Sequence, residues 1–248
     1  MPGIGKPAPW IETVMQLEAI RQAVTEQGLL LRRGFYPDAE DSVPLLRNGR
    51  RPTTVLLLGN AGDAMWRSFR ASPEGQSADD GSAVSSDPLD RWTHRIVTAL
   101  AEVFGAEAVF PFGGPPYYPF QQWACRAEPV WPSPLGVLIH RNYGLWHAYR
   151  GALCFDARIP IPEFAAGESP CEACPDRPCL SSCPVSAFNG ESYDVPACAA
   201  HLATPAGADC MELGCRARRA CPVGADFRYA PEQAAFHMQA FLNARPKV

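Results

Sequence analysis

The chain has 248 residues, of which 47% are apolar and 19% are charged, and its formal net charge is −4. A chain of this length folds into one or two domains and can bury a core without disulfide bonds. The mildly acidic balance argues against a surface dominated by nucleic-acid binding, although it leaves room for a local basic patch.

The N-terminal segment lacks the apolar stretch of a signal peptide, and apolar runs such as residues 55–58 are far too short to span a bilayer. We therefore expect a cytoplasmic protein without a membrane partner. Thiols stay reduced in that compartment, so the ten cysteines favour metal binding or redox chemistry over disulfide bonds.

Helix and strand signals alternate through the first 165 residues. In chain order the sequence predicts a helix over about 11–27, a strand over 53–58, a helix over 63–70, a loop over 71–86, a helix over 88–104, a strand over 108–112, a helix over 120–126, and strands over 135–140 and 151–155. A last helix is predicted over 231–243. The alternation indicates a mixed α/β (α+β) architecture.

The cysteines divide the chain into two parts. Residues 1–165 contain only Cys125 and Cys154, which we interpret as packed thiols. The other eight lie within 51 residues, at Cys171, Cys174, Cys179, Cys183, Cys198, Cys210, Cys215 and Cys221. We predict two domains, 1–165 and 166–248, with a linker at 159–170 where repeated proline and glycine oppose regular helix.

The cysteine spacing is close to that of two-cluster ferredoxins. The first run, CEACPDRPCLSSCP, reads C-x2-C-x4-C-x3-C-P, whereas the bacterial ferredoxin run is C-x2-C-x2-C-x3-C-P. Downstream, GCRARRACPVG has Arg218 where two-cluster ferredoxins usually place another cysteine. Cys210 restores the count to eight, which suits two [4Fe-4S] clusters in a ferredoxin-like module.

Analogy with the crossed ligation of such modules divides the ligands between the clusters. One cluster is assigned Cys171, Cys174, Cys179 and Cys221. The other is assigned Cys183, Cys198, Cys210 and Cys215. Zinc held by four thiolates is the structural alternative, and disulfides are less favoured. The arginines between Cys215 and Cys221 are interpreted as a solvated face or, if close to a cluster, as charges that stabilise its reduced form.

Two further segments resemble a known superfamily. DPLDRWTHRIVTALAEVFGAEAVFPF and, above all, GVLIHRNYGLWHAYRGALCFDARIPIPE are similar to the cobalamin-binding core of the CblC-type vitamin B12 trafficking chaperones and the epoxyqueuosine reductases, and more distantly to the reductive dehalogenases. The second segment is most like the CblC type. The cysteine module is similar instead to that of the epoxyqueuosine reductases, which carry two [4Fe-4S] clusters. The resemblance covers about residues 50–230.

The resemblance implies a flavin-reductase-like or nitroreductase-like domain that binds cobalamin, followed by clusters that pass electrons to cobalt. The cofactor-binding residues it implies are His140, Tyr143, Trp146 and Arg150. No D-x-H-x-x-G occurs, so a histidine-ligated corrinoid module is not indicated. For His140 a structural role is the alternative, and for Arg150 an ordinary ion pair is. The implied function is reduction or processing of bound cobalamin with electrons from a redox partner protein.

Two departures bear on the reaction. Epoxyqueuosine reductases have an acidic residue where this chain has Phe112, Gly113 and Gly114, and they add a helical-repeat tail used on tRNA. Neither feature is found in this sequence, so tRNA is not an expected partner, the substrate is undefined, and enzymatic activity stays open. The alternatives are a ferredoxin-like electron carrier without a corrinoid and a zinc-stabilised binding module.

Overall fold

The structure is a computed structural model that describes residues 9–77, 87–165 and 167–244. It divides into two compact units. The first comprises Met1–Asn60, Ser68–Glu128 and Tyr149–Phe164; the second comprises Ala61–Arg67, Pro129–Ala148 and Ala165–Val248. The last segment of the second unit begins at Ala165, next to the predicted domain boundary, and the division into domains 1–165 and 166–248 stays a prediction. By their contacts, two earlier segments, 61–67 and 129–148, also belong to that unit. Across the three described ranges, no helix has the length and apolarity to cross a membrane.

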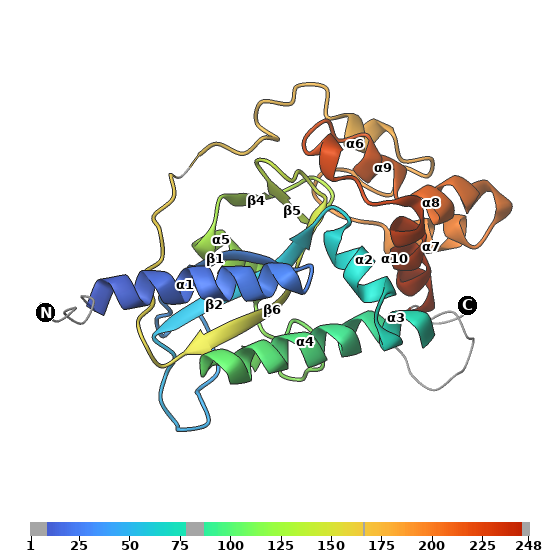
Figure 1. The fold of residues 1–248 in the computed structure, drawn as a ribbon. Coiled ribbons are helices and arrows are strands. Elements are labelled where there is room, and N and C mark those ends of the chain that lie inside the picture. Colours follow the sequence, from blue (N-terminus) through green and yellow to red (C-terminus); the bar gives the residue numbers. More distant parts are fainter. Residues whose placement is uncertain (1–8, 78–86, 166, 245–248) are drawn as a thin grey trace, which may run out of the picture. The chain divides into compact units, whose positions relative to one another are not determined.

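A four-stranded sheet runs through the first unit in the order β1-β2-β6-β3. Figure 1 labels three of its strands, β1, β2 and β6. The strands are β1 (Leu30–Phe35), β2 (Thr54–Ala61), β3 (Glu107–Val109) and β6 (His147–Phe155). β1 pairs with β2, and β3 with β6, in antiparallel fashion. The predicted strands at 53–58, 108–112 and 151–155 are therefore present, with shifted ends. β1 was not predicted, because Arg32 and Arg33 interrupt its apolar pattern.

Helices of the first unit follow the predicted order closely. They are α1 (Pro9–Glu26), α3 (Pro73–Ser77), α4 (Pro88–Phe104) and α5 (Phe120–Ala127), and α2 (Ala64–Arg70) runs across the division between the units. Gly105 ends α4 in the left-handed conformation, at φ 66°, as a glycine C-cap does. The prediction of a loop over 71–86 is wrong at 73–77, where Ser72 accepts a hydrogen bond from the Gly75 N–H and starts a short helix. Residues 78–86 lie outside the described ranges.

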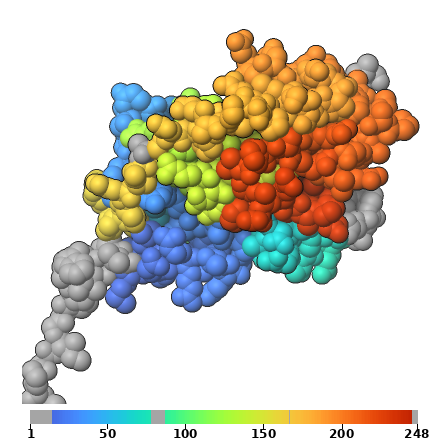
Figure 2. Space-filling view, turned by 90° about the horizontal axis from the view of Figure 1, so that it is seen from above, coloured from blue at the N-terminus to red at the C-terminus, as the bar shows by residue number. Residues whose placement is uncertain are grey.

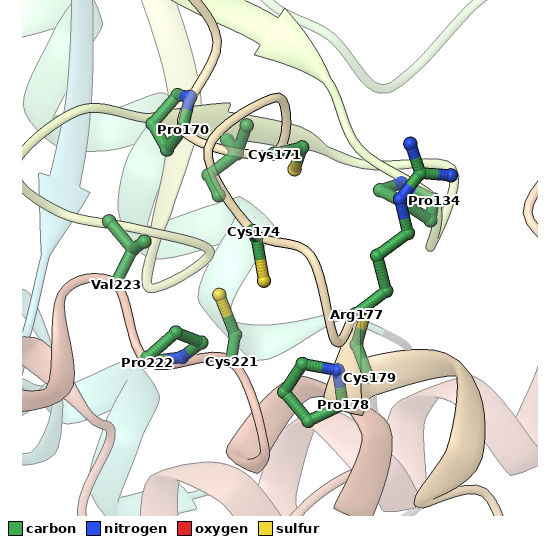
Figure 3. Close-up of a pocket in the computed structure, with 11 residues that line it drawn as sticks. Pro134, Pro170, Cys171, Cys174, Arg177, Pro178, Cys179, Cys221, Pro222 and Val223 are labelled. Atoms are coloured by element: carbon green, nitrogen blue, oxygen red, sulfur yellow. The ribbon is translucent and has the colours of Figure 1, made fainter.

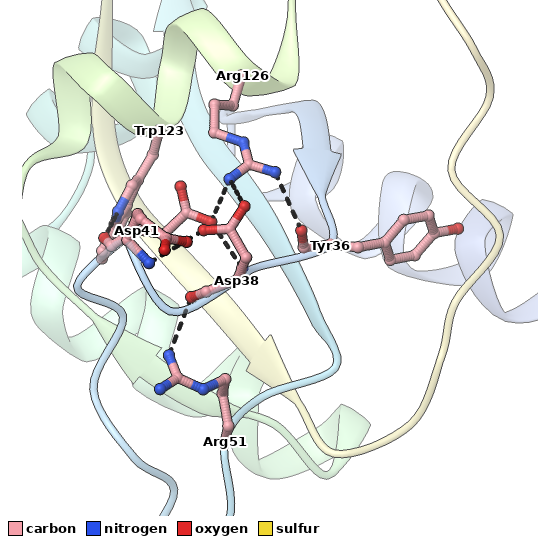
Figure 4. A network of polar contacts seen from close by, with 7 residues as sticks. Tyr36, Asp38, Asp41, Arg51, Trp123 and Arg126 are labelled. Carbon is pink, nitrogen blue, oxygen red and sulfur yellow. Dashed lines mark hydrogen bonds and ion pairs between the residues drawn. The ribbon is translucent and has the colours of Figure 1, made fainter.

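Two charged networks lie within the first unit. Arg32 and Glu128 form an ion pair at 2.8 Å, with side chains only 2% and 5% exposed. In the second network, Arg126 donates to the carboxylates of Asp38 and Asp41, both at 2.5 Å (Figure 4). The indole N–H of Trp123 donates to the Asp41 carbonyl oxygen at 2.7 Å. These contacts join the chain that follows β1 to α5.

The second unit is built from short helices and one hairpin. Its elements are β4 (Val130–Pro132), β5 (Leu138–His140), α6 (Pro178–Ser181), α7 (Val195–Leu202), a 3-10 turn at Pro205–Gly207, α8 (Ala208–Leu213), α9 (Arg216–Arg219), a 3-10 turn at Ala225–Phe227 and α10 (Pro231–Asn243). The helix predicted over 231–243 is confirmed and packs along α8. In Figure 2 the gold chain at about 167–180 lies beside the red chain at about 220–244. The packing of α6 against α9 agrees with this view.

Two thiol-lined pockets as the candidate functional site

Four thiols line the first pocket of the second unit (Figure 3). They are Cys171, Cys174, Cys179 and Cys221. The remaining lining residues are mostly apolar: Pro134, Ile139, Pro170, Pro178, Pro222 and Val223, with Arg177. Prolines set the local backbone, since Pro178 starts α6 and thereby places the next residue, Cys179, on its first turn. A proline also stands next to the fourth thiol, since Pro222 follows Cys221 at the C-terminal end of the cysteine module.

The other four thiols of the module line a second pocket. They are Cys183, Cys198, Cys210 and Cys215. Cys198 projects from α7, whose first turn is capped by Asp194 through a 2.9 Å hydrogen bond from the Ala197 N–H. Cys210 lies on α8, and Cys215 immediately precedes α9. His201 on α7 and Arg216 on α9 add two polar side chains to the lining, which is otherwise mostly apolar through Phe188, Leu202 and Met238. Sequence reasoning did not single out His201.

The two pockets share one apolar core. Leu135, Ile139, Leu145, Ala187, Phe188 and Ala217 form it together with Cys179 and Cys221. Burial raises the pKa of the thiols of Cys171, Cys179, Cys215 and Cys221, and neighbouring thiols of the same pocket add to the rise. Without a bound metal these four thiols therefore stay protonated at neutral pH. A metal centre that binds them must displace those protons.

Each pocket gathers four thiol donors. Across the described residues, no group of three or more His, Cys, Asp or Glu side chains is arranged to hold a metal ion. In a four-iron cluster each thiolate binds a different iron, so the four ligands surround the cluster and do not meet at one atom. Four thiols with an apolar lining supply the ligand type and number of such a cluster.

The segment that carries His140, Tyr143 and Trp146 also belongs to the second unit. His140 is 8% exposed, and its Nδ1 accepts hydrogen bonds from the backbone N–H groups of Asn142 and Tyr143 at 3.0 and 3.2 Å. Its ring stacks on Tyr143 at 4.4 Å. Trp146 is 2% exposed and meets Tyr229 edge-on at 5.4 Å. The three residues are therefore brought together by local turn geometry and covered by side chains of the same unit.

Arg150, the fourth predicted cofactor-binding residue, belongs to the first unit. Its Nη2 lies 2.6 Å from an Asp90 carboxylate oxygen, and Nη2 and Nε donate to the Thr93 hydroxyl. The ion pair foreseen as the structural alternative is thus present. Cys125 and Cys154 line neither thiol pocket. Cys154 is buried, and burial raises its pKa to about 12, so it is a packed thiol, whereas Cys125 is exposed.

Arg218 does not take the place of the missing cysteine, and it lines neither pocket. Its Nε and Nη2 donate to the Leu145 carbonyl oxygen at 3.0 and 2.5 Å. The guanidinium carbon lies 4.5 Å from the centre of the Trp146 ring and 4.7 Å from that of Tyr229. The interruption of the ferredoxin spacing at this position was the available signal, but sequence alone could not give the direction of the side chain.

No protein-family model and no curated protein matches the chain. Among solved structures, it is similar to the crystal structure of a B12-trafficking protein CblC from C. elegans, described as a homologue of human MMACHC, with a TM-score of 0.52 at 16% identity. The match covers 94% of this chain and 100% of that chain. The expectation of a CblC-like mixed α and β fold is confirmed. The epoxyqueuosine reductase likeness and the ferredoxin-like module stay predictions.

Proposed function

We propose that this protein is an iron–sulfur redox protein that reduces or processes a bound corrinoid, with one [4Fe-4S] cluster in each thiol-lined pocket. The observation that carries the proposal is the sorting of eight cysteines into two pockets of four. Cys221 joins a pocket with thiols 42 to 50 residues earlier in the chain, as crossed ligation requires. A four-thiolate set is what one cluster needs.

The thiolates hold the clusters, and their surroundings adjust the reduction potential. Cys171, Cys174, Cys179 and Cys221 are the ligands of the first cluster. Cys183, Cys198, Cys210 and Cys215 are those of the second. When bound, the clusters supply one-electron transfer, and a redox partner protein supplies the electrons. The apolar lining keeps water from the thiolates, and backbone N–H groups such as that of Ala187, 3.3 Å from the Cys183 sulfur, stabilise their charge.

The corrinoid part of the proposal is supported by the fold. The matched structure is named a B12-trafficking protein, and the match extends over nearly the whole chain. The sequence resemblance assigns His140, Tyr143, Trp146 and Arg150 to corrinoid binding, and each of the four is proposed as a candidate contact on its own. The burial of His140 and Trp146 favours the second candidate function, an electron carrier that binds no corrinoid, because neither ring is accessible to a large planar ligand.

Metal analysis of anaerobically purified protein tests the cluster assignment. We expect a brown protein with about eight irons and eight sulfides per chain. Cys174→Ala and Cys210→Ala should each lower the iron to about half, because each removes a ligand from one of two clusters. Cys125→Ala is the matched control and should keep all the iron. A colourless protein that contains zinc, or full iron in Cys210→Ala, contradicts the assignment.

Titration with cob(II)alamin separates the two candidate functions. Reduction of a bound corrinoid requires binding, which shifts the visible absorption spectrum of the corrinoid. An unchanged spectrum at saturating protein, in a preparation that carries its iron, rejects corrinoid reduction and leaves the electron carrier.

A further inference from the structure

We propose that Arg218 is a positioning residue that ties the cluster-bearing segment to the turn at residues 143–146, so that filling the thiol pockets fixes this turn. The inference rests on the proposed function for the identity of the metal centres. It goes beyond that function by assigning a role to a side chain that stands where two-cluster ferredoxins have a ligand.

The place of Arg218 in the chain links it to both pockets. It lies on α9, three residues after Cys215 of the second pocket and three before Cys221 of the first. α9 has only four residues, and so short a helix does not hold its shape by backbone hydrogen bonds alone. Its position depends on what holds its two ends. Metal centres bound by Cys215 and Cys221 would fix both ends.

The side chain of Arg218 is in turn fixed on the 143–146 turn. Two of its N–H groups share the Leu145 carbonyl oxygen, and its planar cation lies against the rings of Trp146 and Tyr229. In the described part of the chain it forms no ion pair. A guanidinium held by one carbonyl and two ring faces has little freedom, and a lysine cannot reproduce the paired hydrogen bonds.

A second junction binds the same turn to the chain after Cys221. A Cβ atom on Gly144 would overlap the Val223 carbonyl oxygen, and one on Gly224 would overlap the Tyr143 carbonyl group. Both glycines have positive φ, 56° and 72°. The Tyr143 ring also meets Phe227 at 4.9 Å. The turn is thus held by the segment from Arg218 to Tyr229, which begins between two proposed ligands.

Hydrogen exchange at the backbone N–H groups of the turn tests the inference. Gly144 N donates to the His140 carbonyl oxygen at 2.9 Å, and Trp146 N donates to that of Tyr143 at 2.9 Å. In metal-loaded protein, Arg218→Lys should keep its iron but exchange at these two amides about tenfold faster than wild type. Wild-type protein stripped of metal should show a similar loss of protection.

The matched control is Arg219→Lys, on the same helix. Arg219 contacts Asp209 and the Gly214 carbonyl oxygen and not the turn, so this variant should leave exchange at Gly144 and Trp146 unchanged. Full protection in metal-loaded Arg218→Lys, or in metal-stripped wild type, overturns the inference. Arg218→Cys adds a separate check, because the Arg218 side chain points away from both pockets. If this change restored iron in a Cys210→Ala background, position 218 could act as a ligand, and the inference would be overturned.

The same measurements separate the inference from the proposed function. If the protein carries zinc in place of iron, the proposed function is contradicted. Exchange with and without that zinc still decides whether filling the pockets fixes the turn.

Discussion

Loss of the Glu128 carboxylate should strongly destabilise the first unit, because it removes the charged partner of a buried guanidinium. Glu128 Oε1 lies 2.8 Å from Arg32 Nη2, and Oε2 accepts from Arg32 Nε at 3.3 Å. The Tyr149 hydroxyl donates to Glu128 Oε1 at 2.6 Å. With the two charged side chains only 2% and 5% exposed, water does not replace the lost partner.

The magnitude follows from this burial. Breaking one side of a buried ion pair costs about 3–5 kcal/mol, and leaving the Tyr149 hydroxyl without its acceptor adds about 1 kcal/mol. Glu128→Ala should therefore lower the free energy of unfolding by about 4–6 kcal/mol. Replacing the whole network, in Arg32→Met, Glu128→Leu and Tyr149→Phe together, should cost far less, since apolar groups of similar volume carry no desolvation penalty.

Urea denaturation followed by circular dichroism measures both variants against wild type, with similar m values expected if the native fold is kept. Arg50→Lys is a control. The Arg50 side chain is 69% exposed, so its ion pair with Asp156 should contribute less than about 1 kcal/mol to the free energy of unfolding. A loss below about 1 kcal/mol in Glu128→Ala, or a triple variant as unstable as the single one, would refute the reasoning.

Three other outcomes are expected. The hydrogen bonds that Arg95 donates lower the pKa of Glu74 from 4.5 to about 2. Glu74→Gln should therefore lower the free energy of unfolding by about 1 kcal/mol at pH 7, a value reduced by the solvent exposure of Arg95. In acid denaturation the difference from wild type should fade between about pH 4.5 and 2, as Glu74 takes up its proton. An unchanged difference at pH 2 contradicts this. Gln233 is fully buried, and neither its amide oxygen nor its amide nitrogen has a hydrogen-bond partner in the described part of the chain. Gln233→Leu should therefore raise the free energy of unfolding, measured by urea denaturation, by about 1 kcal/mol. A lower free energy of unfolding would show that the amide is hydrogen-bonded. Gly144→Ala should lower the melting temperature by several degrees, because the added methyl group overlaps the Val223 carbonyl oxygen. An unchanged melting temperature would contradict this close contact.

Elements with a strong local signal were predictable. α4 combines a proline at its start, an apolar face and a glycine stop, so its bounds follow from the sequence. α10 also begins with a proline, although it ends before Ala244 without a glycine. β1 was missed because Arg32 is buried on a strand, where its partner Glu128, 96 residues away, offsets the charge. α3 was missed because five residues carry little periodic pattern.

The assignment of the eight cysteines to two sets of four came from analogy with the crossed ligation of two-cluster ferredoxins, and it stays a prediction, although each of the two pockets is lined by one of these sets. The directions of Arg218 and of the Trp146 ring were decided by tertiary structure. Each depends on residues distant in sequence, with Arg218 reaching Leu145 across 73 positions. A spacing pattern records which residues are near one another along the chain, but the contacts of a side chain are set only when separate segments pack together.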